Sequence, residues 1–288
     1  MPEDPPRLTQ PLPLLYEGIV RRALEEDLGR AGDITTDAIA PAGALAKGSI
    51  VARAPGRIAG LEVALSAFCQ LDPAISAEIR IADGSDAAAG DILALLEGKA
   101  RTILTAERTA LNLLGRLCGI ATSTRNVLAV VAPYGAKVVC TRKTTPGLRA
   151  IEKYAVRAGG GSNHRFGLDD AVLIKDNHRV LAGSLTEAVR RVRARVGHMV
   201  KIEAEVDTIA QLEEALSLTV DAVLMDNMSV PDLARGVRMA KGKAITEASG
   251  GITPETAAAV AATGVDLLSI GWLTHSAPSL DVSLDLSF

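Results

Sequence analysis

The sequence predicts an α/β protein in two parts, an N-terminal α/β sandwich domain followed by a parallel β/α barrel truncated to six or seven strands. After Tyr134, short apolar runs alternate with helical patterns, as in a parallel sheet, open or closed into a barrel. Glu205, Asp226 and Glu247 are spaced 21 residues apart, each at the predicted carboxyl end of a strand, where β/α barrels carry their active sites. The roughly 140 residues after Lys137 are too few for eight strand–helix units.

The N-terminal part mixes helices with short strands. We expect residues 1–117 to form its domain, joined by the C-terminal tail 278–288, and residues 118–277 to form the barrel. A turn at residues 89–98 suggests a small β-sandwich, and a lysine suitable for a carrier modification is missing there. The expected helices are 14–27, 61–71 and 105–132, and the expected strands are 48–53 and 75–82.

The C-terminal part repeats one strand–helix unit. Ser184 and Glu187 form a capping-box pattern, and Pro254 after Thr253 marks a helix start. A Gly-x-Gly-x-x-Gly fingerprint is missing, which weakens a dinucleotide-binding interpretation. The expected strands are 137–140, 171–174, 200–206, 222–225, 244–247 and 267–270, and the expected helices are 184–196, 208–217, 229–240 and 253–262.

Composition excludes several classes of protein. The 288 residues carry a net charge of −3 and one tryptophan, so a general nucleic-acid binder is not expected. No apolar run is long enough for a membrane span, and the first residues do not resemble a signal peptide. The three cysteines form no C-x-x-C pair, and this favours a reduced, cytoplasmic location.

Residues 141–180 form a basic segment within this acidic chain. Eight lysines and arginines face four acids there, so a small anionic ligand is indicated. A solvated helix face is the alternative explanation for Arg149, Lys153 and Arg157, which stand at helical spacing. It does not account for the remaining basic residues, which lie among glycine, asparagine and threonine.

Within this segment the residue types suit carboxylates and phosphates. Arg142 offers a planar fork to a carboxylate, and Lys143 offers a point charge to a phosphate. Glycines 159–161 allow a ligand close to the backbone, and His164 and Arg165 follow them. Lys175 follows the next expected strand. Upstream, Arg108 near a helix start has a surface pair with Glu107 as its ordinary explanation.

The downstream strands supply carboxylates and glycines. Glu203 and Glu205 share one face of a strand, and Asp226 ends the next. Carboxylates beside so many cations would suit Mg²⁺ bridging a pyrophosphate. The alternative is a barrel-interior salt bridge to Lys201 or Lys175. The glycine-rich turns 248–252 and 269–271 indicate a phosphate cradle, and a plain turn is the alternative for either one alone.

Seven motifs in this order make the sequence specific. They are ERTALN, TRKTTPGLR, GGGSNHRFGLDD, LIKDNH, EAEVDT, LMDN and EASGGI. The chain closely resembles the quinolinate phosphoribosyltransferase family, also called nicotinate-nucleotide pyrophosphorylase (carboxylating), from about Glu26 to Ser276. Gly115 and Trp272 depart from the family pattern. The resemblance implies phosphoribosyl transfer from phosphoribosyl pyrophosphate to quinolinate, giving nicotinate mononucleotide, pyrophosphate and CO₂ in de novo NAD biosynthesis.

The resemblance also implies roles for individual residues. Lys143, Lys175, Glu205 and Asp226 would be catalytic, with Glu205 and Asp226 binding Mg²⁺. A homodimer, with a higher oligomer left open, would share its sites, because Arg108 would come from the partner subunit. Quinolinate would contact Arg108, Arg142, His164, Arg165 and Lys175. Phosphoribosyl pyrophosphate would contact Lys143, Asn177, Glu205, Asp226, Ser249, Gly250, Gly251 and Gly271.

Two other functions fit the same pattern. A paralogue with this fold could use a substrate that lacks one carboxylate, but the three arginines of the proposed acid site are all present. A catalytically inactive barrel could serve as a binding module, but Lys143 and the pair Glu205 and Asp226 are retained. The sequence therefore favours the phosphoribosyltransferase.

Overall fold

The computed structural model describes residues 8–287, which divide into two compact units. The first unit contains residues up to 125 together with 144–160 and 272 onward, and the second contains 126–143 and 161–271. The C-terminal residues thus group with the N-terminal ones, and so does the segment 144–160. The predicted α/β class is confirmed, since an antiparallel sheet lies in the first unit and a six-stranded parallel sheet in the second.

The first unit is built on a four-stranded antiparallel sheet in the order β12-β1-β5-β3. The C-terminal strand β12 pairs with β1, Lys47 opposite Ser287 and Ala52 opposite Val282. Only the start of the turn expected at residues 89–98 is a turn, because strand β5 begins at Ile92. The strands of this unit are β1 (Leu45–Ala52), β2 (Gly56–Arg57), β3 (Ser76–Ile79), β4 (Asp86–Ala87), β5 (Ile92–Lys99) and β12 (Val282–Ser287).

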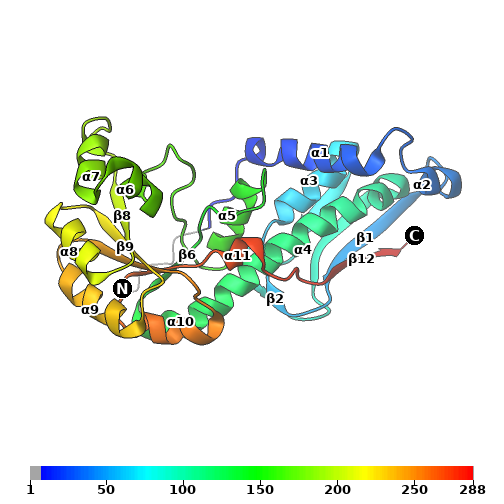
Figure 1. Cartoon of the computed structure of the whole chain (residues 1–288). Helices are drawn as coiled ribbons and strands as arrows, with labels where there is room; N and C mark the ends of the chain where they lie inside the picture. Colours follow the sequence, from blue (N-terminus) through cyan, green and yellow to red (C-terminus); the bar gives the residue numbers. More distant parts are fainter. Residues whose placement is uncertain (1–7, 288) are drawn as a thin grey trace. The chain divides into compact units, whose positions relative to one another are not determined.

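Helices pack beside this sheet, and α1 and α3 lie against each other (Figure 1). Helix α3 has the predicted bounds, whereas α4 begins five residues earlier than expected. No helix within residues 8–287 is long and apolar enough to cross a membrane. The helices are η1 (Pro13–Leu15), α1 (Glu17–Leu28), α2 (Ile34–Ile39), α3 (Leu61–Leu71), α5 (Arg149–Ala158) and α11 (Trp272–His275), with α4 (Ala100–Val131) continuing into the second unit.

Gly115 allows the C-terminal segment to lie directly on α4. The amide N–H of Leu280 donates to the Gly115 carbonyl at 2.9 Å. A Cβ atom at Gly115 would stand only 2.8 Å from the Leu280 carbonyl oxygen, closer than two such atoms can approach. The departure from the family pattern at this position is therefore matched by a close backbone contact.

Helix α5 carries Arg149, Lys153 and Arg157, for which a solvated helix face was the alternative explanation. The side chain of Lys153 is fully buried, and so is that of Glu152, so the solvated-face interpretation is wrong for Lys153. Arg116 on α4 donates to Glu152 Oε1 from Nε and Nη2 at 3.2 and 3.0 Å. Thr145 adds its backbone N–H and its hydroxyl. A charged network thus holds α5 in place.

The second unit is a parallel sheet in the order β6-β11-β10-β9-β8-β7. Its six strands agree with the lower of the two predicted numbers. The strands are β6 (Lys137–Val139), β7 (Val172–Ile174), β8 (Ile202–Val206), β9 (Ala222–Asp226), β10 (Ile245–Ser249) and β11 (Leu267–Ser269). The helices are η2 (Ala132–Tyr134), α6 (Asp176–Ala182), α7 (Leu185–Arg193), α8 (Ile209–Ser217), α9 (Val230–Ala240) and α10 (Pro254–Ala261).

Side-chain alternation gives this sheet one apolar and one polar face. Helices α8, α9 and α10 run along its outer side (Figure 1). Gly236 of α9 lies so close to Met225 that a Cβ there would meet the Met225 sulfur, so Met225 marks the helix-covered face. Successive strand residues point to opposite faces, so Asp226 points away from the helices. The polar face is therefore the inner one.

Breaking the network around Glu152 should destabilise the first unit. In Arg116→Met the fully buried Glu152 carboxylate loses its guanidinium, which typically costs roughly 3–5 kcal/mol. Urea unfolding of the variant and the wild type measures the loss. Arg125→Met is the control, because Arg125 pairs with Asp86 on the surface and should cost less than about 1 kcal/mol. Equal effects of the two variants would contradict the assignment.

Candidate active site

Three polar residues stand in a row at the carboxyl end of the parallel sheet. Asp226 is the last residue of β9 and the register partner of Ser249, the last residue of β10. Glu205 on β8 is the partner of Leu224, two residues before Asp226. Since partners in a parallel sheet face the same side and alternation has period two, all three share the inner face. The prediction of carboxylates at this edge agrees with their positions.

Lys175 lies directly against this row. It precedes α6 as its N-cap residue, and its Nζ donates to Glu205 Oε2 at 2.8 Å. The side chain of Lys175 remains 47% exposed, whereas that of Glu205 is 10% exposed. The salt bridge to Lys175 that sequence reasoning kept as an alternative for Glu205 is thus present. Asn177 stands in the first turn of α6 and is exposed.

Two arginines of the basic segment lie close enough to repel each other. Burial lowers the pKa of Arg165, and the charge of Arg142 lowers it further. The Nε atom of Arg142 is buried and has no hydrogen-bond partner within the described residues. Neighbouring cations with a buried donor to spare favour an anion between them. Lys143, next in sequence, is exposed.

The turn after β10 requires glycine. Gly250 and Gly251 have φ angles of +91° and +58°, and a Cβ on Gly250 would lie 2.1 Å from Asn227 Oδ1. The backbone N–H of Asn227 donates to the Ser249 carbonyl at 2.9 Å, which holds the turn against β9. Helix α10 then begins at Pro254, with Thr253 as its cap. Gly271 similarly follows β11 and precedes α11.

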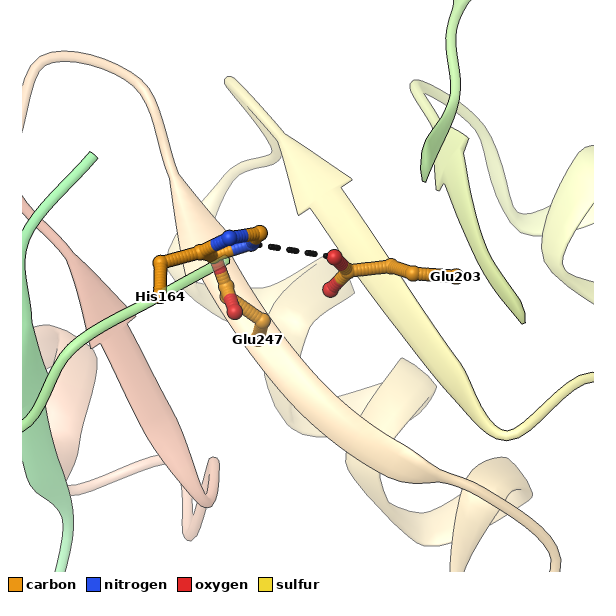
Figure 2. Close-up of side chains that lie close together, drawn as sticks. All are labelled: His164, Glu203 and Glu247. Atoms are coloured by element: carbon orange, nitrogen blue, oxygen red, sulfur yellow. Dashed lines mark hydrogen bonds and ion pairs between the residues drawn. The ribbon is translucent and has the colours of Figure 1, made fainter. Parts of the chain in front are cut away.

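Three titratable side chains also meet on the inner face of the sheet. His164 Nε2 lies 3.0 Å from Glu203 Oε2 and 3.5 Å from Glu247 Oε1, and Figure 2 shows both carboxylates beside the imidazole. Glu247 lies in the middle of β10, so its expected place at the strand end is wrong, because β10 extends two residues further. Glu203 pairs with His164, while Lys201 pairs with Asp221.

The proton positions on His164 follow from its neighbours. Its Nδ1 accepts the backbone N–H of Arg165 at 2.7 Å, so the hydrogen of a neutral ring is on Nε2 and points at Glu203. A metal ligand must offer a lone pair instead. Although the ligand atoms of His164, Glu203 and Glu247 lie within 4.8 Å of one another, the ring is oriented as a donor to the carboxylates.

Burial changes the acidity of Glu247. Its side chain is almost completely buried, and burial, followed by the nearby charge of Glu203, raises its pKa to about 7. His164 and a hydrogen bond with Ser269 oppose this rise. Beside the carboxylate of Glu203, Glu247 therefore keeps its proton to a higher pH than a free glutamic acid does. Sequence reasoning missed this role of Glu247, although its 21-residue spacing had singled it out.

Arg108 belongs to the first unit. It lies on α4 with its side chain 66% exposed, and its Nη2 is 3.9 Å from Glu107 Oε1. This weak surface contact is the ordinary pairing considered from the sequence. The role expected for Arg108 across a subunit interface stays a prediction.

Family models match most of the chain. The model described as "Quinolinate phosphoribosyl transferase, N-terminal domain" matches residues 33–118, and that of the C-terminal domain matches 120–285. The chain belongs to the quinolinate phosphoribosyltransferase family. It is 46% identical to the nicotinate-nucleotide pyrophosphorylase [carboxylating] of Mycobacterium leprae, over 93% of this chain and 95% of that one. It is 43% identical to the probable enzyme of the same name from Bacillus subtilis, over 91% and 90%.

Solved structures of the family show the same fold. The nicotinate-nucleotide pyrophosphorylase from Francisella tularensis superposes with a TM-score of 0.93 at 35% identity, covering 99% of this chain and 100% of that one. NadC from Streptococcus pyogenes gives a TM-score of 0.93 at 38% identity, covering 97% and 99%. The sequence resemblance is therefore confirmed at the level of family and fold.

The raised pKa of Glu247 makes stability depend on pH. A carboxyl whose pKa rises from 4.5 to about 7 on folding stabilises the fold fully below pH 4.5, and this contribution is lost as the pH rises toward 7. Glu247→Gln cannot ionise at this position. Between pH 4.5 and pH 8, the free energy of unfolding of the wild type should therefore fall by on the order of 1–3 kcal/mol relative to that of the variant. Urea unfolding at both pH values measures this difference. Glu213→Gln, at an exposed site, should show almost none, and an equal trend in both variants would refute the prediction.

Proposed function

We propose that this protein transfers the phosphoribosyl group of phosphoribosyl pyrophosphate to quinolinate with decarboxylation. The products would be nicotinate mononucleotide, pyrophosphate and CO₂, in de novo NAD biosynthesis. The names of the relatives support this proposal. The observation that carries it is the pair Arg142 and Arg165, since their repulsion, together with the buried Arg142 Nε that has no partner within the described residues, suits a dicarboxylate.

The acid substrate needs several cations. Quinolinate carries two carboxylates, at C2 and C3 of its pyridine ring. Arg142, Arg165 and Lys175 would bind them, with His164 beside Arg165 and Arg108 supplied by the partner subunit. Neutralising these carboxylates matters because the second substrate is also a polyanion. Binding next to phosphoribosyl pyrophosphate would otherwise be opposed by charge repulsion.

The phosphoribosyl donor would occupy the carboxyl end of the sheet. The glycine turn after β10 exposes backbone N–H groups just before α10, an arrangement that suits a phosphate. Lys143 would neutralise the pyrophosphate, and the carboxylates of β8 and β9 would bind the ribose hydroxyls. The proposed contacts are Lys143, Asn177, Glu205, Asp226, Ser249, Gly250, Gly251 and Gly271.

Glu205 and Asp226 also suit Mg²⁺. Two carboxylates on neighbouring strands, completed by substrate phosphates and water, are a usual donor set for this ion. Lys175, which pairs with Glu205, has a half-exposed side chain, so the ion could replace it. When bound, Mg²⁺ would neutralise the charge of the departing pyrophosphate. The Glu205 and Asp226 carboxylates would also stabilise positive charge that develops on the ribose.

The remaining chemistry comes from the substrate. The pyridine nitrogen of quinolinate has a free lone pair, so its attack on the ribosyl carbon needs no general base. The new C–N bond leaves a positive charge on the ring. This charge stabilises the electron pair that stays on C2 when the C2–carboxylate bond breaks and CO₂ departs, and C2 then takes up a proton from solvent. The protein residues therefore mainly hold and neutralise the reactants.

We also propose a homodimer that shares its active sites and a cytoplasmic location. The first follows from the family resemblance at Arg108. The second rests on the cysteines, since Cys69, Cys118 and Cys140 form no disulfide within the described residues.

Substrate choice tests the proposed function directly. Nicotinate lacks the 2-carboxylate, so a cation at the acid site would lose its partner, and kcat/KM should be lower than for quinolinate by roughly a hundredfold or more. Release of pyrophosphate from phosphoribosyl pyrophosphate, measured with each acid, gives both values. Comparable values would contradict the acid site, and no pyrophosphate release with quinolinate would contradict the function.

Asp226→Asn tests the role of the second carboxylate. The change removes charge from a group that acts mainly on the developing ribosyl cation, so kcat should fall far more than affinity for quinolinate. Steady-state kinetics at saturating Mg²⁺ and calorimetric titration with quinolinate separate the two effects. A variant with a near-normal kcat would show that Asp226 is only structural.

Mixed dimers test the origin of Arg108. Arg108→Ala and Lys175→Ala should each be inactive, but mixed dimers should contain one site with both residues intact if Arg108 acts across the interface. Random pairing of equal amounts makes half the dimers mixed, so activity should recover to roughly a quarter of the wild type. Absence of recovery, with subunit exchange shown by mass spectrometry, would mean that Arg108 serves its own subunit.

A further inference from the structure

The cluster of His164, Glu203 and Glu247 has no assigned role for its two carboxylates. The side chains of Glu203 and Glu247 are at most 12% exposed, so direct contact with a large substrate is restricted. Both are nevertheless on the inner face, as the register of β8, β9 and β10 requires. Buried carboxylates destabilise a protein unless they are paired or hydrogen-bonded, and His164 is the side chain that both of them contact.

We propose that Glu203 and Glu247 are positioning residues, which hold the His164 imidazole in one orientation and one tautomer and so place Arg165 for the acid substrate. This inference rests on the proposed function, because Arg165 is assigned there to quinolinate. The two carboxylates act through His164 and touch neither substrate.

Glu203 and Glu247 hold the His164 ring from one side. Glu203 accepts the His164 Nε2 hydrogen at 3.0 Å, and the Glu247 oxygen lies 3.5 Å from the same nitrogen. Figure 2 shows the carboxylates approaching the ring from two different strands. With its hydrogen directed to Nε2, the ring presents a lone pair at Nδ1.

The ring is in turn linked to Arg165. Nδ1 accepts the Arg165 backbone N–H at 2.7 Å, a bond that the opposite tautomer or an imidazolium would replace with repulsion between two hydrogens. Arg165 Nη1 donates to the Ala171 carbonyl at 3.3 Å. Glu203 also acts on Arg165 by its charge, because it opposes the lowering of the Arg165 pKa. One carboxylate thus orients the ring and also stabilises the charge of the guanidinium.

The His164 ring needs the contacts with Glu203 and Glu247 to keep its orientation. A pocket of about 380 Å³, lined by His164, Glu203, Glu247 and Lys201 among others, adjoins the ring. Without the carboxylates, the imidazole has room to turn into this pocket. The Arg165 backbone bond would then be lost, and the guanidinium would no longer be held over the acid site.

The Glu247 carboxyl carries a proton in this cluster. A second ionised carboxylate beside Glu203 is unfavourable in a buried layer, so a neutral Glu247 is the form that completes the cluster. A glutamine has nearly the same shape and is always neutral. Glu247→Gln should therefore preserve the contacts with the ring, whereas Glu247→Leu, of similar size and without polar atoms, should not.

The kinetic test compares conservative and apolar variants. Glu203→Leu and Glu247→Leu should raise the KM for quinolinate by about tenfold or more while changing the KM for phosphoribosyl pyrophosphate less than about twofold, and Glu247→Gln should stay close to the wild type. Lys201→Gln is the matched control, because Lys201 lines the same pocket but has an exposed side chain bonded to Asp221. Folded Leu variants with an unchanged KM for quinolinate would overturn the proposal.

The second readout does not depend on activity or on the Leu variants. Long-range ¹H–¹⁵N spectra of the wild type, with the His164 signals assigned by His164→Gln, should show one tautomer with its hydrogen on Nε2. Hydrogen on Nδ1, or exchange between tautomers, would overturn the positioning role even if the Leu variants did not fold. Wild-type protein with the expected tautomer but no turnover of quinolinate would instead overturn the proposed function.

Discussion

The inner face of the six-stranded sheet carries more charge than a protein interior normally accepts, and the second unit is arranged around the pairing of that charge. Glu203, Glu205 and Glu247 all point to this face because residues of one face recur at every second position. Each carboxylate has to find a cation, a donor or a proton. The basic segment supplies them, Lys175 for Glu205 and His164 for the other two.

The two charged clusters of this face differ in exposure. Near the carboxyl edge, Lys175, which pairs with Glu205, is half exposed. The imidazole of His164 and its two carboxylates are enclosed, and Glu247 is protonated more readily than a free glutamic acid. An exposed cation beside an enclosed cluster suits a site whose substrates are themselves charged, since the cluster keeps its shape while ions at the edge are replaced.

Local patterns predicted most of the second unit correctly. Every expected strand and helix from residue 184 onward is present, because period-two and helical patterns are read directly from neighbouring residues. Helix α5 shows where such reasoning fails. Its basic residues Arg149, Lys153 and Arg157 stand at helical spacing, but Lys153 is fully buried, as is its neighbour Glu152, which Arg116 on α4 contacts. Burial of a charged side chain depends on partners that are distant in sequence.

The sequence by itself determined the α/β class, the order of elements and the family, because these follow from periodicity and from motifs within short segments. It also determined which residues reach the carboxyl edge of the sheet, Glu205 and Asp226 among them. Only the tertiary structure decided how their charges are paired. His164 lies 39 residues from Glu203 and 83 from Glu247, and only the folded chain brings its imidazole beside both carboxylates.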